Sequence, residues 1–354
     1  MIFLEYPVSL YFDTEPAVQV LDLCRGDNDF RKVYIANDGK RKLVIKYMSN
    51  TFSDRRRIEG WLRLMDAYRD AGIYCPAVIP ARTGETICCE TKDGRDYFCY
   101  AEEFAVYETA EHIGEEDCRD EDGNYTYTPD VMRSLGKIAS AGLDFLDWSS
   151  AYCLLEPFSP PDTTDEGTEC ALLFRDYVKE NLPRHLPRTE ALLDLFYRNQ
   201  AELKKIYHTL PVSCFQGDLN ESNILLDENR RFAGLIDFNL CGREPVLNYT
   251  VREALWAVYD RCLFGENDAR LCHYDKALDD IRIRSFLRNM AYVQETYTFS
   301  EQEREAFPLL FRYMNSFWWQ TLSEIERVHE DEESITKLLD WLEHQMTRDD
   351  IRLP

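Results

Sequence analysis

Three side chains of types that often bind magnesium lie close together in the segment 213–242, SCFQGDLNESNILLDENRRFAGLIDFNLCG. Asp218 and Asn223 have the spacing D-x-x-x-x-N, and Asn223 leads directly into the apolar run ILLD. A polar turn follows, and a second apolar run, FAGLID, ends at Asp237. The two runs predict an antiparallel hairpin, so Asn223 and Asp237 should meet at one end of it, with Asp218 in the loop just before.

Carboxylate and amide oxygens suit Mg²⁺, which takes one or two protein carboxylates and completes its shell with water and substrate phosphates. Buried carboxylates this close repel one another unless a cation or a donor joins them. The spacing D-x-x-x-x-N is weak evidence by itself, because a chain of this length holds on the order of one such match by chance. The alternative is a polar hairpin whose Asp and Asn residues only cap turns.

The first hundred residues predict a small antiparallel sheet with one helix. The runs KVYIANDGKRKLVIKY and ICCETKDGRDYFCYAEEF each place a turn signal between two alternating strands. Between them, SDRRRIEGWLRLMDAYRDAG has a capping residue at its start, apolar residues at helical spacing and a glycine at its end. The order is therefore strands, one helix, strands.

The rest of the chain predicts mostly helices. They are expected at 130–146, 188–209, 249–263, 274–297, 301–330 and 333–346. The fold class is thus α+β, with a small sheet lobe at 1–104 and a larger helical lobe at 105–354. The hairpin within 213–242 is expected at the junction of the two lobes.

The segment QGDLNESNILLD…GLIDF resembles the catalytic segment of the aminoglycoside phosphotransferase and choline kinase families, which belong to the protein-kinase-like superfamily. This resemblance implies a two-lobe kinase-like fold and an enzyme that transfers phosphate from ATP, with Mg²⁺, to the hydroxyl of a small molecule. Asp218 would be the catalytic base. Asn223 and Asp237 would be the magnesium ligands.

The same resemblance implies a lysine and a glutamate in the sheet lobe. The strand LVIK ends in Lys46, which would contact the ATP phosphates, and Glu59 in the helix would hold its ammonium. Each residue has an ordinary alternative. Lys46 could be a solvent-facing strand lysine, and Glu59 could be one charge among several on an exposed helix.

Two further nucleotide contacts follow from the resemblance. The turn containing Gly26 and Asn28 would cover the phosphates, although an ordinary loop has the same composition. The segment CYAEEF lies where the hinge between lobes should be. There the carbonyl of Glu102 and the amide of Phe104 would pair with the adenine, in a register that could differ by one or two residues.

The chain departs from the family pattern at two positions. Gln216 stands where the family usually has a histidine that braces the catalytic loop, and Asn248 stands where an aspartate pins its backbone. Both replacements can still form hydrogen bonds, but they leave a weak or inactive kinase-like binding protein as an alternative. A protein kinase is less compatible, because only eleven residues separate Phe238 from Thr250, too few for a long activation segment.

Composition limits the partners. The chain has 41 basic and 65 acidic residues among 354, a formal charge of −24, which argues against nucleic acid and anionic membranes as partners. The acidity would suit a cationic acceptor. Twelve scattered cysteines without a C-x-x-C pair fit a reducing cytoplasm. The first residues lack the basic stretch of a signal peptide, and no apolar run is long enough to span a membrane.

The acceptor site itself is less clear in the sequence. The aromatic segment 314–322, MNSFWWQTL, is expected to be helix core, with a cage for a cation as the alternative. Asn239 and Glu244 lie close enough to the motif in sequence to contact an acceptor. No other residue pattern beyond 250 indicates a substrate.

Overall fold

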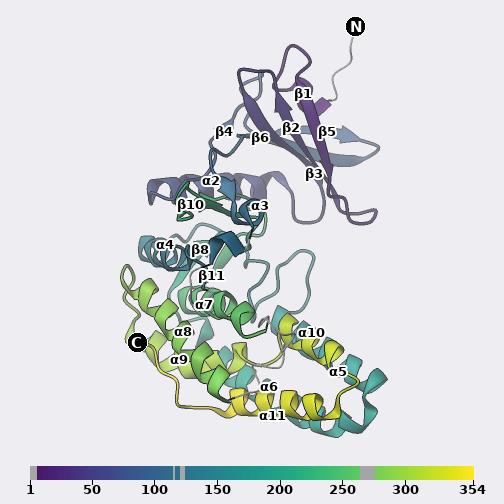
Figure 1. The fold of residues 1–354 in the computed structure, drawn as a ribbon. Helices are drawn as coiled ribbons and strands as arrows, with labels where there is room; N and C mark the ends of the chain where they lie inside the picture. Colours follow the sequence, from purple (N-terminus) through teal and green to yellow (C-terminus); the bar gives the residue numbers. More distant parts are fainter. Residues whose placement is uncertain (1–5, 115, 120–123, 264–275) are drawn as a thin grey trace.

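The computed structural model describes residues 6–114, 116–119, 124–263 and 276–354. A sheet-rich lobe lies at the top of Figure 1, and a larger helical lobe lies below it. Within the described ranges, no helix is both long and apolar enough to cross a membrane. This is the α+β arrangement of two lobes that the sequence predicts; the exact boundary at residue 104 stays a prediction.

An antiparallel sheet of six strands forms the N-terminal lobe. Its main path runs β1-β2-β3-β6-β4, and β5 also pairs with β6. The strands are β1 (Ala17–Asp22), β2 (Phe30–Asn37), β3 (Lys42–Ser49), β4 (Val78–Ile79), β5 (Cys88–Lys92) and β6 (Arg95–Glu103). The predicted turns contain Gly39 and Gly94, whose φ angles are 84° and 75°. Glycine adopts this left-handed conformation without steric strain because it has no Cβ.

The two faces of this sheet have different neighbours. One face packs Ile45 and Ala101 against Tyr11, which follows the short helix α1 (Tyr6–Ser9). The other face carries Lys46 and Tyr100, which lie directly opposite each other on β3 and β6. Side chains alternate along a strand, so this second face presents the lysine toward α2 and the helical lobe.

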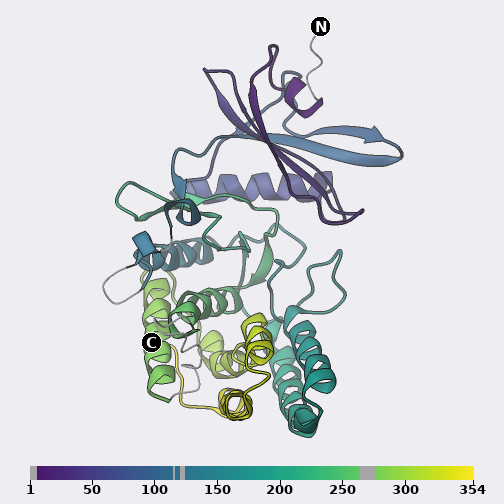
Figure 2. The same cartoon turned by 45° about the vertical axis from the view of Figure 1, so that its right-hand side comes forward.

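The helix α2 (Arg55–Asp70) is the one predicted between the strands. Asp54 caps it, because its carboxylate accepts the backbone N–H of Arg57 at 2.8 Å. Ile58 and Trp61 are fully buried and fix which face of the helix turns inward. Figure 2 shows α2 crossing beneath the sheet, between it and the helical lobe.

The helical lobe consists of helices and short strand pairs. The helices are α3 (Ala110–Ile113), α4 (Thr128–Ala141), α5 (Glu166–Asn181), α6 (Leu186–Tyr207), α7 (Val246–Leu263), α8 (Lys276–Gln294), α9 (Glu301–Met314), α10 (Trp319–Arg327) and α11 (Glu332–Thr347), with short 3-10 turns at Glu116–Cys118 and Pro183–His185. The strands are β7 (Glu108–Thr109), β8 (Val212–Phe215), β9 (Ile224–Leu226), β10 (Phe232–Leu235) and β11 (Gly242–Pro245). β9 and β10 form the predicted hairpin, β7 pairs with β9, and β8 pairs with β11.

Two helix predictions need correction. The helix α5 was not expected, and the helix expected at 301–330 is divided into α9 and α10. Asn315 ends α9, where its backbone N–H donates to the carbonyl of Phe311, and Trp318 is in extended conformation before α10. Residues 274 and 275 of the helix expected at 274–297 lie outside the described residues, and the described helix begins at Lys276.

Candidate active site

The carboxylate of Asp218 is held in a defined orientation. It lies in the loop between β8 and β9, and two side-chain amides donate to it. Nδ2 of Asn220 donates to Oδ1 at 2.8 Å, and Nδ2 of Asn223 donates to Oδ2 at 3.0 Å. With its Nδ2 turned to Asp218, Asn223 keeps its amide oxygen available as an acceptor.

Asp237 follows β10 in a left-handed conformation, with φ at 56°. Such a backbone conformation is uncommon for a residue other than glycine and persists only where its surroundings hold it. Gln216 supplies that hold: its Nε2 donates to the carbonyl of Asp237 at 2.7 Å, and its Oε1 accepts the N–H of Asp218 at 2.7 Å. One fully buried, neutral side chain therefore connects the two carboxylate-bearing segments.

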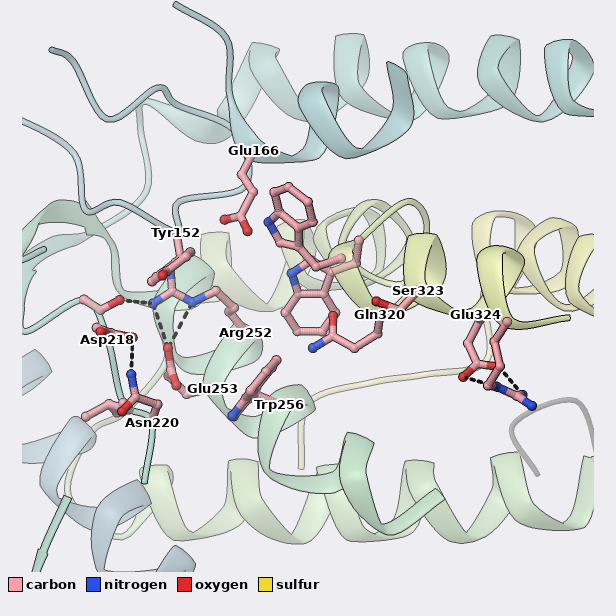
Figure 3. A pocket seen from close by; sticks show the side chains of 15 residues that line it. Tyr152, Glu166, Asp218, Asn220, Arg252, Glu253, Trp256, Gln320, Ser323 and Glu324 are labelled. Atoms are coloured by element: carbon pink, nitrogen blue, oxygen red, sulfur yellow. Dashed lines mark hydrogen bonds and ion pairs between the residues drawn. The ribbon is translucent and has the colours of Figure 1, made fainter. Parts of the chain in front are cut away.

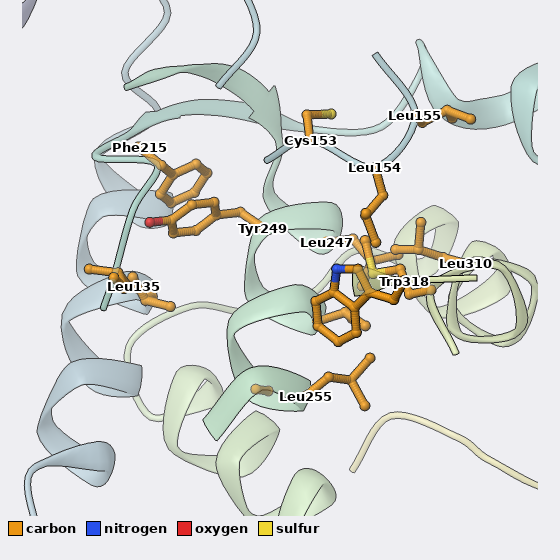
Figure 4. Packing of buried hydrophobic residues seen from close by; sticks show 14 of the residues in the cluster. Leu135, Cys153, Leu154, Leu155, Phe215, Leu247, Tyr249, Leu255, Leu310 and Trp318 are labelled. Atoms are coloured by element: carbon orange, nitrogen blue, oxygen red, sulfur yellow. The ribbon is translucent and has the colours of Figure 1, made fainter. Parts of the chain in front are cut away.

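Two tyrosine hydroxyls hold the backbone before Asp218. The hydroxyl of Tyr68 in α2 accepts the N–H of Gln216 at 3.0 Å, and the hydroxyl of Tyr249 in α7 accepts the N–H of Gly217 at 3.2 Å. The ring of Tyr249 stacks on Phe215 with 4.1 Å between centroids, as Figure 4 shows. The loop that carries Asp218 is thus fixed from both lobes.

Asn248 does not pin this loop, contrary to the prediction. Its Nδ2 donates to the carboxylate of Glu244 and lies 3.6 Å from Sγ of Cys153. Neighbouring residues on a helix point about 100° apart, so Tyr249 faces the loop while Asn248 faces the interior. Glu244 is only 2% exposed and is engaged in this network, which overturns the expectation that it contacts an acceptor.

Lys46 reaches the same site from the sheet lobe. Its Nζ lies 3.2 Å from Oδ1 of Asp237 and 3.4 Å from Oε1 of Glu102. Burial disfavours its charge, but Asp237 and Glu102 outweigh burial, so the pKa of Lys46 lies well above its usual value. The predicted pair with Glu59 is not formed, because Glu59 is on the exposed side of α2. A strand residue, Glu102, takes that position instead.

The hinge register also needs correction. The backbone N–H of Phe104 donates to the carbonyl of Lys42 at 2.9 Å, so it is not free to bind adenine. The reason is that β6 continues to pair with β3 to its end, with Glu103 opposite Leu43. Glu102 contributes to the site through its carboxylate, in addition to any contact of its carbonyl.

The turn between β1 and β2 contains Gly26 and Asn28. Gly26 has a φ of 67°, the left-handed region that favours glycine. Arg95 in β6 donates to the carbonyl of Asn28 at 3.1 Å and to that of Asp27 at 2.9 Å. The predicted phosphate-covering turn is therefore attached to the sheet at its far side.

Asp218 lines two cavities at once. One is the cleft between the lobes, about 680 Å³, which is also lined by Asp237, Asn223 and the β1–β2 turn. The other is a pocket of about 630 Å³ within the helical lobe (Figure 3). Tyr152 and Glu166 line both cavities as well. The carboxylate of Asp218 thus stands where a ligand in the cleft and a ligand in the pocket would meet.

The position of Asp218 between the two cavities raises the pKa of its carboxyl group. Burial, and then the nearby charge of Asp237, raise the pKa of its carboxyl above the usual value. Asn220, Arg252 and Asn223 oppose this shift without cancelling it. A carboxylate with a raised pKa is a better proton acceptor than an exposed one.

The pocket has aromatic walls and buried charges. The ring centroids of Trp256 and Trp318 lie 6.2 Å apart, and their ring planes meet at 70°. Trp319, the next residue along the chain, is 41% exposed. Trp318 and Trp319 belong to the segment 314–322, whose other aromatic residue, Phe317, is core. The segment therefore contributes both to the core and to the lining of the pocket, and its role as a cage for a cation stays a prediction.

Glu166 and Arg252 are two of the pocket residues that sequence reasoning missed. Glu166 is 8% exposed, and its Oε2 has no hydrogen-bond partner among the described residues. Burial raises the pKa of Glu166 to about 8, although Arg252 opposes this. Arg252 pairs with Glu253 at 2.7 Å and donates to the carbonyl of Gly217 at 3.4 Å. Both residues lie on helices with many charges, so no local pattern distinguishes them.

A family model described as "Phosphotransferase enzyme family" matches residues 21–248, which include Lys46, Asp218 and Asp237. The chain belongs to this phosphotransferase family. No curated protein sequence matches it significantly. The family assignment makes the chain an enzyme that transfers phosphoryl groups.

Solved structures support the fold of this phosphotransferase. A microcompartment-associated aminopropanol kinase has a TM-score of 0.50 and 16% identity, over 96% of this chain and 93% of that one. An amicoumacin kinase in complex with AMP-PNP, Ca²⁺ and Ami has a TM-score of 0.55 and 12% identity, over 96% and 91%. At these identities the likeness concerns the fold, and it confirms the predicted two-lobe kinase-like class.

Proposed function

We propose that this phosphotransferase transfers the γ-phosphoryl group of ATP, with Mg²⁺, to the hydroxyl of a small molecule that carries a positive charge. The observation that carries the proposal is the position of Asp218, which lines both the cleft between the lobes and the pocket in the helical lobe. Nucleotide in the cleft and acceptor in the pocket would place their reacting atoms on the two sides of this carboxylate.

In the proposed reaction Asp218 acts as the base that orients the acceptor hydroxyl. The acceptor hydroxyl would donate a hydrogen bond to the Asp218 carboxylate, which orients its oxygen toward the γ-phosphorus. As the new O–P bond forms, the bond from the γ-phosphorus to the bridging oxygen breaks and its electron pair stays on ADP. The hydroxyl proton passes to Asp218 late in this step, as in other phosphoryl transfers that depend mainly on alignment and charge.

The residues present fit a magnesium ion. Two carboxylates, Asp218 and Asp237, and the amide of Asn223 lie at the end of one hairpin, while no cluster of three or more His, Cys, Asp or Glu that could hold a metal occurs in the described part of the chain. A site with few protein oxygens is typical of Mg²⁺, which binds substrate phosphates as well. Asn223 and Asp237 would hold the ion, which supplies positive charge to the phosphates.

Lys46 would bind the α- and β-phosphates of the nucleotide. It lies on β3, the strand position that the family uses, and its ammonium is oriented by Glu102 and Asp237. The amicoumacin kinase of similar fold was solved with the ATP analogue AMP-PNP, which supports ATP as the donor. In our proposal Glu102 keeps the ammonium in place when Asp237 turns to the metal.

A positive charge on the acceptor would suit the pocket. Aromatic faces attract ammonium groups, and Trp256, Trp318 and Trp319 line this cavity. Glu166 brings a carboxyl group with an unpaired oxygen into it. An ammonium beside Glu166 would stabilise its ionised form and would lower its raised pKa. The volume, about 630 Å³, suits a ligand of drug size.

The test compares Asp218→Ala with the wild type in a coupled assay of ADP release, over a panel of amino alcohols, amino sugars and uncharged sugars. We expect the substitution to abolish transfer while the affinity for ATP, measured by calorimetry, changes little. The exposed Asp194 on α6 provides a control, Asp194→Ala, which should keep full activity. A variant at position 218 that retained most of its turnover would refute the role of base. A wild type that binds ATP but phosphorylates no acceptor would favour the inactive binding protein.

A further inference from the structure

The cleft between the lobes contains many more acidic than basic side chains. The carboxylates that line it are those of Asp29, Asp162, Glu166, Glu169, Asp218 and Asp237, whereas Arg25 and Arg31 are the arginines. A nucleotide triphosphate carries several negative charges, and its transferring phosphoryl group needs positive charge around it. The cation that serves the phosphates should therefore be one that is not already paired with a protein carboxylate.

Arg31 is already committed to a protein carboxylate. Its Nη2 lies 2.8 Å from Oδ2 of Asp29, and its side chain is about one-fifth exposed. Lys46 is likewise paired, with Glu102 and Asp237. Arg25 differs from both, because its side chain is exposed at the cleft and has no ion pair with any described residue.

The β1–β2 turn positions Arg25 at its inner side. The backbone N–H of Arg25 donates to the carbonyl of Asp29 at 2.8 Å, which closes the turn around Gly26. Arg95 fastens the opposite side of the turn through the carbonyls of Asp27 and Asn28. In Figure 2 the tip of this hairpin reaches toward the loop that precedes α5.

Arg25 is close to the catalytic side of the cleft. Its charge favours the ionised form of the Tyr152 phenol, whose pKa is nevertheless raised, chiefly by burial and then by the charge of Asp218. Tyr152 therefore lies within electrostatic reach of both Arg25 and Asp218. All three residues line the same cleft. A γ-phosphate positioned for attack near Asp218 would lie in this space.

We propose that Arg25 is a catalytic cation, which binds the γ-phosphate of ATP and stabilises the negative charge on its non-bridging oxygens during transfer. This role rests on the proposed phosphotransfer and adds a residue to it. Arginine suits the task because its planar group can donate two parallel hydrogen bonds to a phosphate and keeps its charge at any physiological pH. Arg25 accepts no proton and forms no covalent bond in this step. The hydroxyl proton passes to Asp218, and the electron pair of the broken bond stays on ADP.

The test measures nucleotide discrimination as well as rate. For Arg25→Gln we expect kcat to fall on the order of 10²–10³-fold, the usual cost of losing one donor to transition-state charge. The affinity for AMP-PNP should fall about tenfold or more, while that for ADP, which has no γ-phosphate, should stay within about twofold. Arg25→Lys should recover part of both losses because it restores charge without the planar fork.

A charge-matched control is available on the other turn of the sheet. Lys40 is exposed in the β2–β3 turn, and Lys40→Gln removes the same charge without touching the cleft. Its kinetics should equal those of the wild type. If Arg25→Gln keeps the wild-type rate and discrimination, or weakens ADP and AMP-PNP equally, the assignment to the γ-phosphate is overturned. If the wild type binds neither nucleotide, the proposed phosphotransfer itself fails, which is a distinguishable result.

Discussion

The pairing of Lys46 allows a comparison of two glutamates in one lobe. Glu102 on β6 lies 3.4 Å from the lysine ammonium, whereas Glu59 on α2 is exposed. We expect Glu102→Gln to impair catalysis and Glu59→Gln to have no effect beyond about twofold. The two substitutions are chemically identical, so the difference between them reports position alone.

The distance between the Lys46 ammonium and the Glu102 carboxylate sets the loss of activity that we expect for Glu102→Gln. Two unit charges 3.4 Å apart attract by about 5 kcal/mol at an effective dielectric constant of about 20. Part of this is offset by the cost of burying the carboxylate, which is only 4% exposed. A net loss of about 2–4 kcal/mol corresponds to a decrease of about 30- to 1,000-fold in kcat/KM for ATP. Without Glu102, Asp237 would remain as the partner of Lys46 and would compete with the metal.

The assay is steady-state kinetics with ATP as the varied substrate, together with calorimetric titration of ADP and thermal melting of both variants. Melting curves separate a misfolded variant from a folded one with a displaced lysine. The opposite ranking, in which Glu59→Gln is inactive and Glu102→Gln is active, would refute our reasoning. That outcome would mean that the lobes rearrange on nucleotide binding to bring α2 to the lysine.

Three further changes test the rest of the site. Asp237→Ala should remove the magnesium dependence of nucleotide binding, and unchanged affinity in a calorimetric titration with and without Mg²⁺ would count against its role as a ligand. Gly217→Ala should lower stability by about 1–3 kcal/mol and reduce kcat, because φ is 93° and a Cβ would lie 2.2 Å from the carbonyl oxygen of Leu240; denaturant unfolding measures the first effect. Glu166→Gln should change the pH dependence of stability. The folded-state pKa of Glu166, about 8, is raised from 4.5, so the wild type loses stability as pH rises through this interval, by at most about 1.4 kcal/mol per pH unit, and the Gln variant should lose less. Equal slopes of melting temperature between pH 5 and pH 9 for the two proteins would contradict the buried carboxyl.

The β9–β10 hairpin that carries the candidate magnesium ligands could be located from the sequence because the pattern that predicts it is local. Asn223 and Asp237 flank two strands that are adjacent in the chain, so strand pairing alone brings them together. Lys46 was locatable for a similar reason, as it ends an alternating run beside a clear turn. In both cases the strand pairing that carries the prediction is local in the chain, between β9 and β10 and between β2 and β3.

The partner of Lys46 could not be found in this way. Its identity depends on the register between β3 and β6, which places Lys46 opposite Tyr100 and thereby puts Glu102 on the same face. These strands are separated by the whole of α2, so the register is set by tertiary packing. The sequence did indicate, however, that Glu59 lies on the exposed face of its helix. Ile58 and Trp61 mark the buried face of α2, and Glu59 shares the exposed side with Arg63.

The helix that carries Glu166 was missed because of its surroundings. Asp165 caps it by accepting the N–H of Thr168 at 2.9 Å, and Ala171 and Phe174 form its buried stripe. These are ordinary helix signals, but a stretch rich in proline and threonine precedes them and predicts a loop. Even a correct helix prediction would not have shown that Glu166 points into a cavity, since that depends on α7 and α10 on the other side.

The distribution of paired charges in the pocket limits the acceptor more than the net charge of the chain does. Glu253 is paired with Arg252, and Glu324 with Arg327 at 2.6 Å. Asp218 is needed for the hydroxyl in the proposed reaction. Glu166 is thus the pocket carboxyl without an ion pair among the described residues. One such group, beside tryptophan faces, matches an acceptor with a single ammonium and an apolar body better than a polyamine, whose further charges would have to break existing ion pairs. Ranking monoamines against polyamines in the acceptor panel decides between the two.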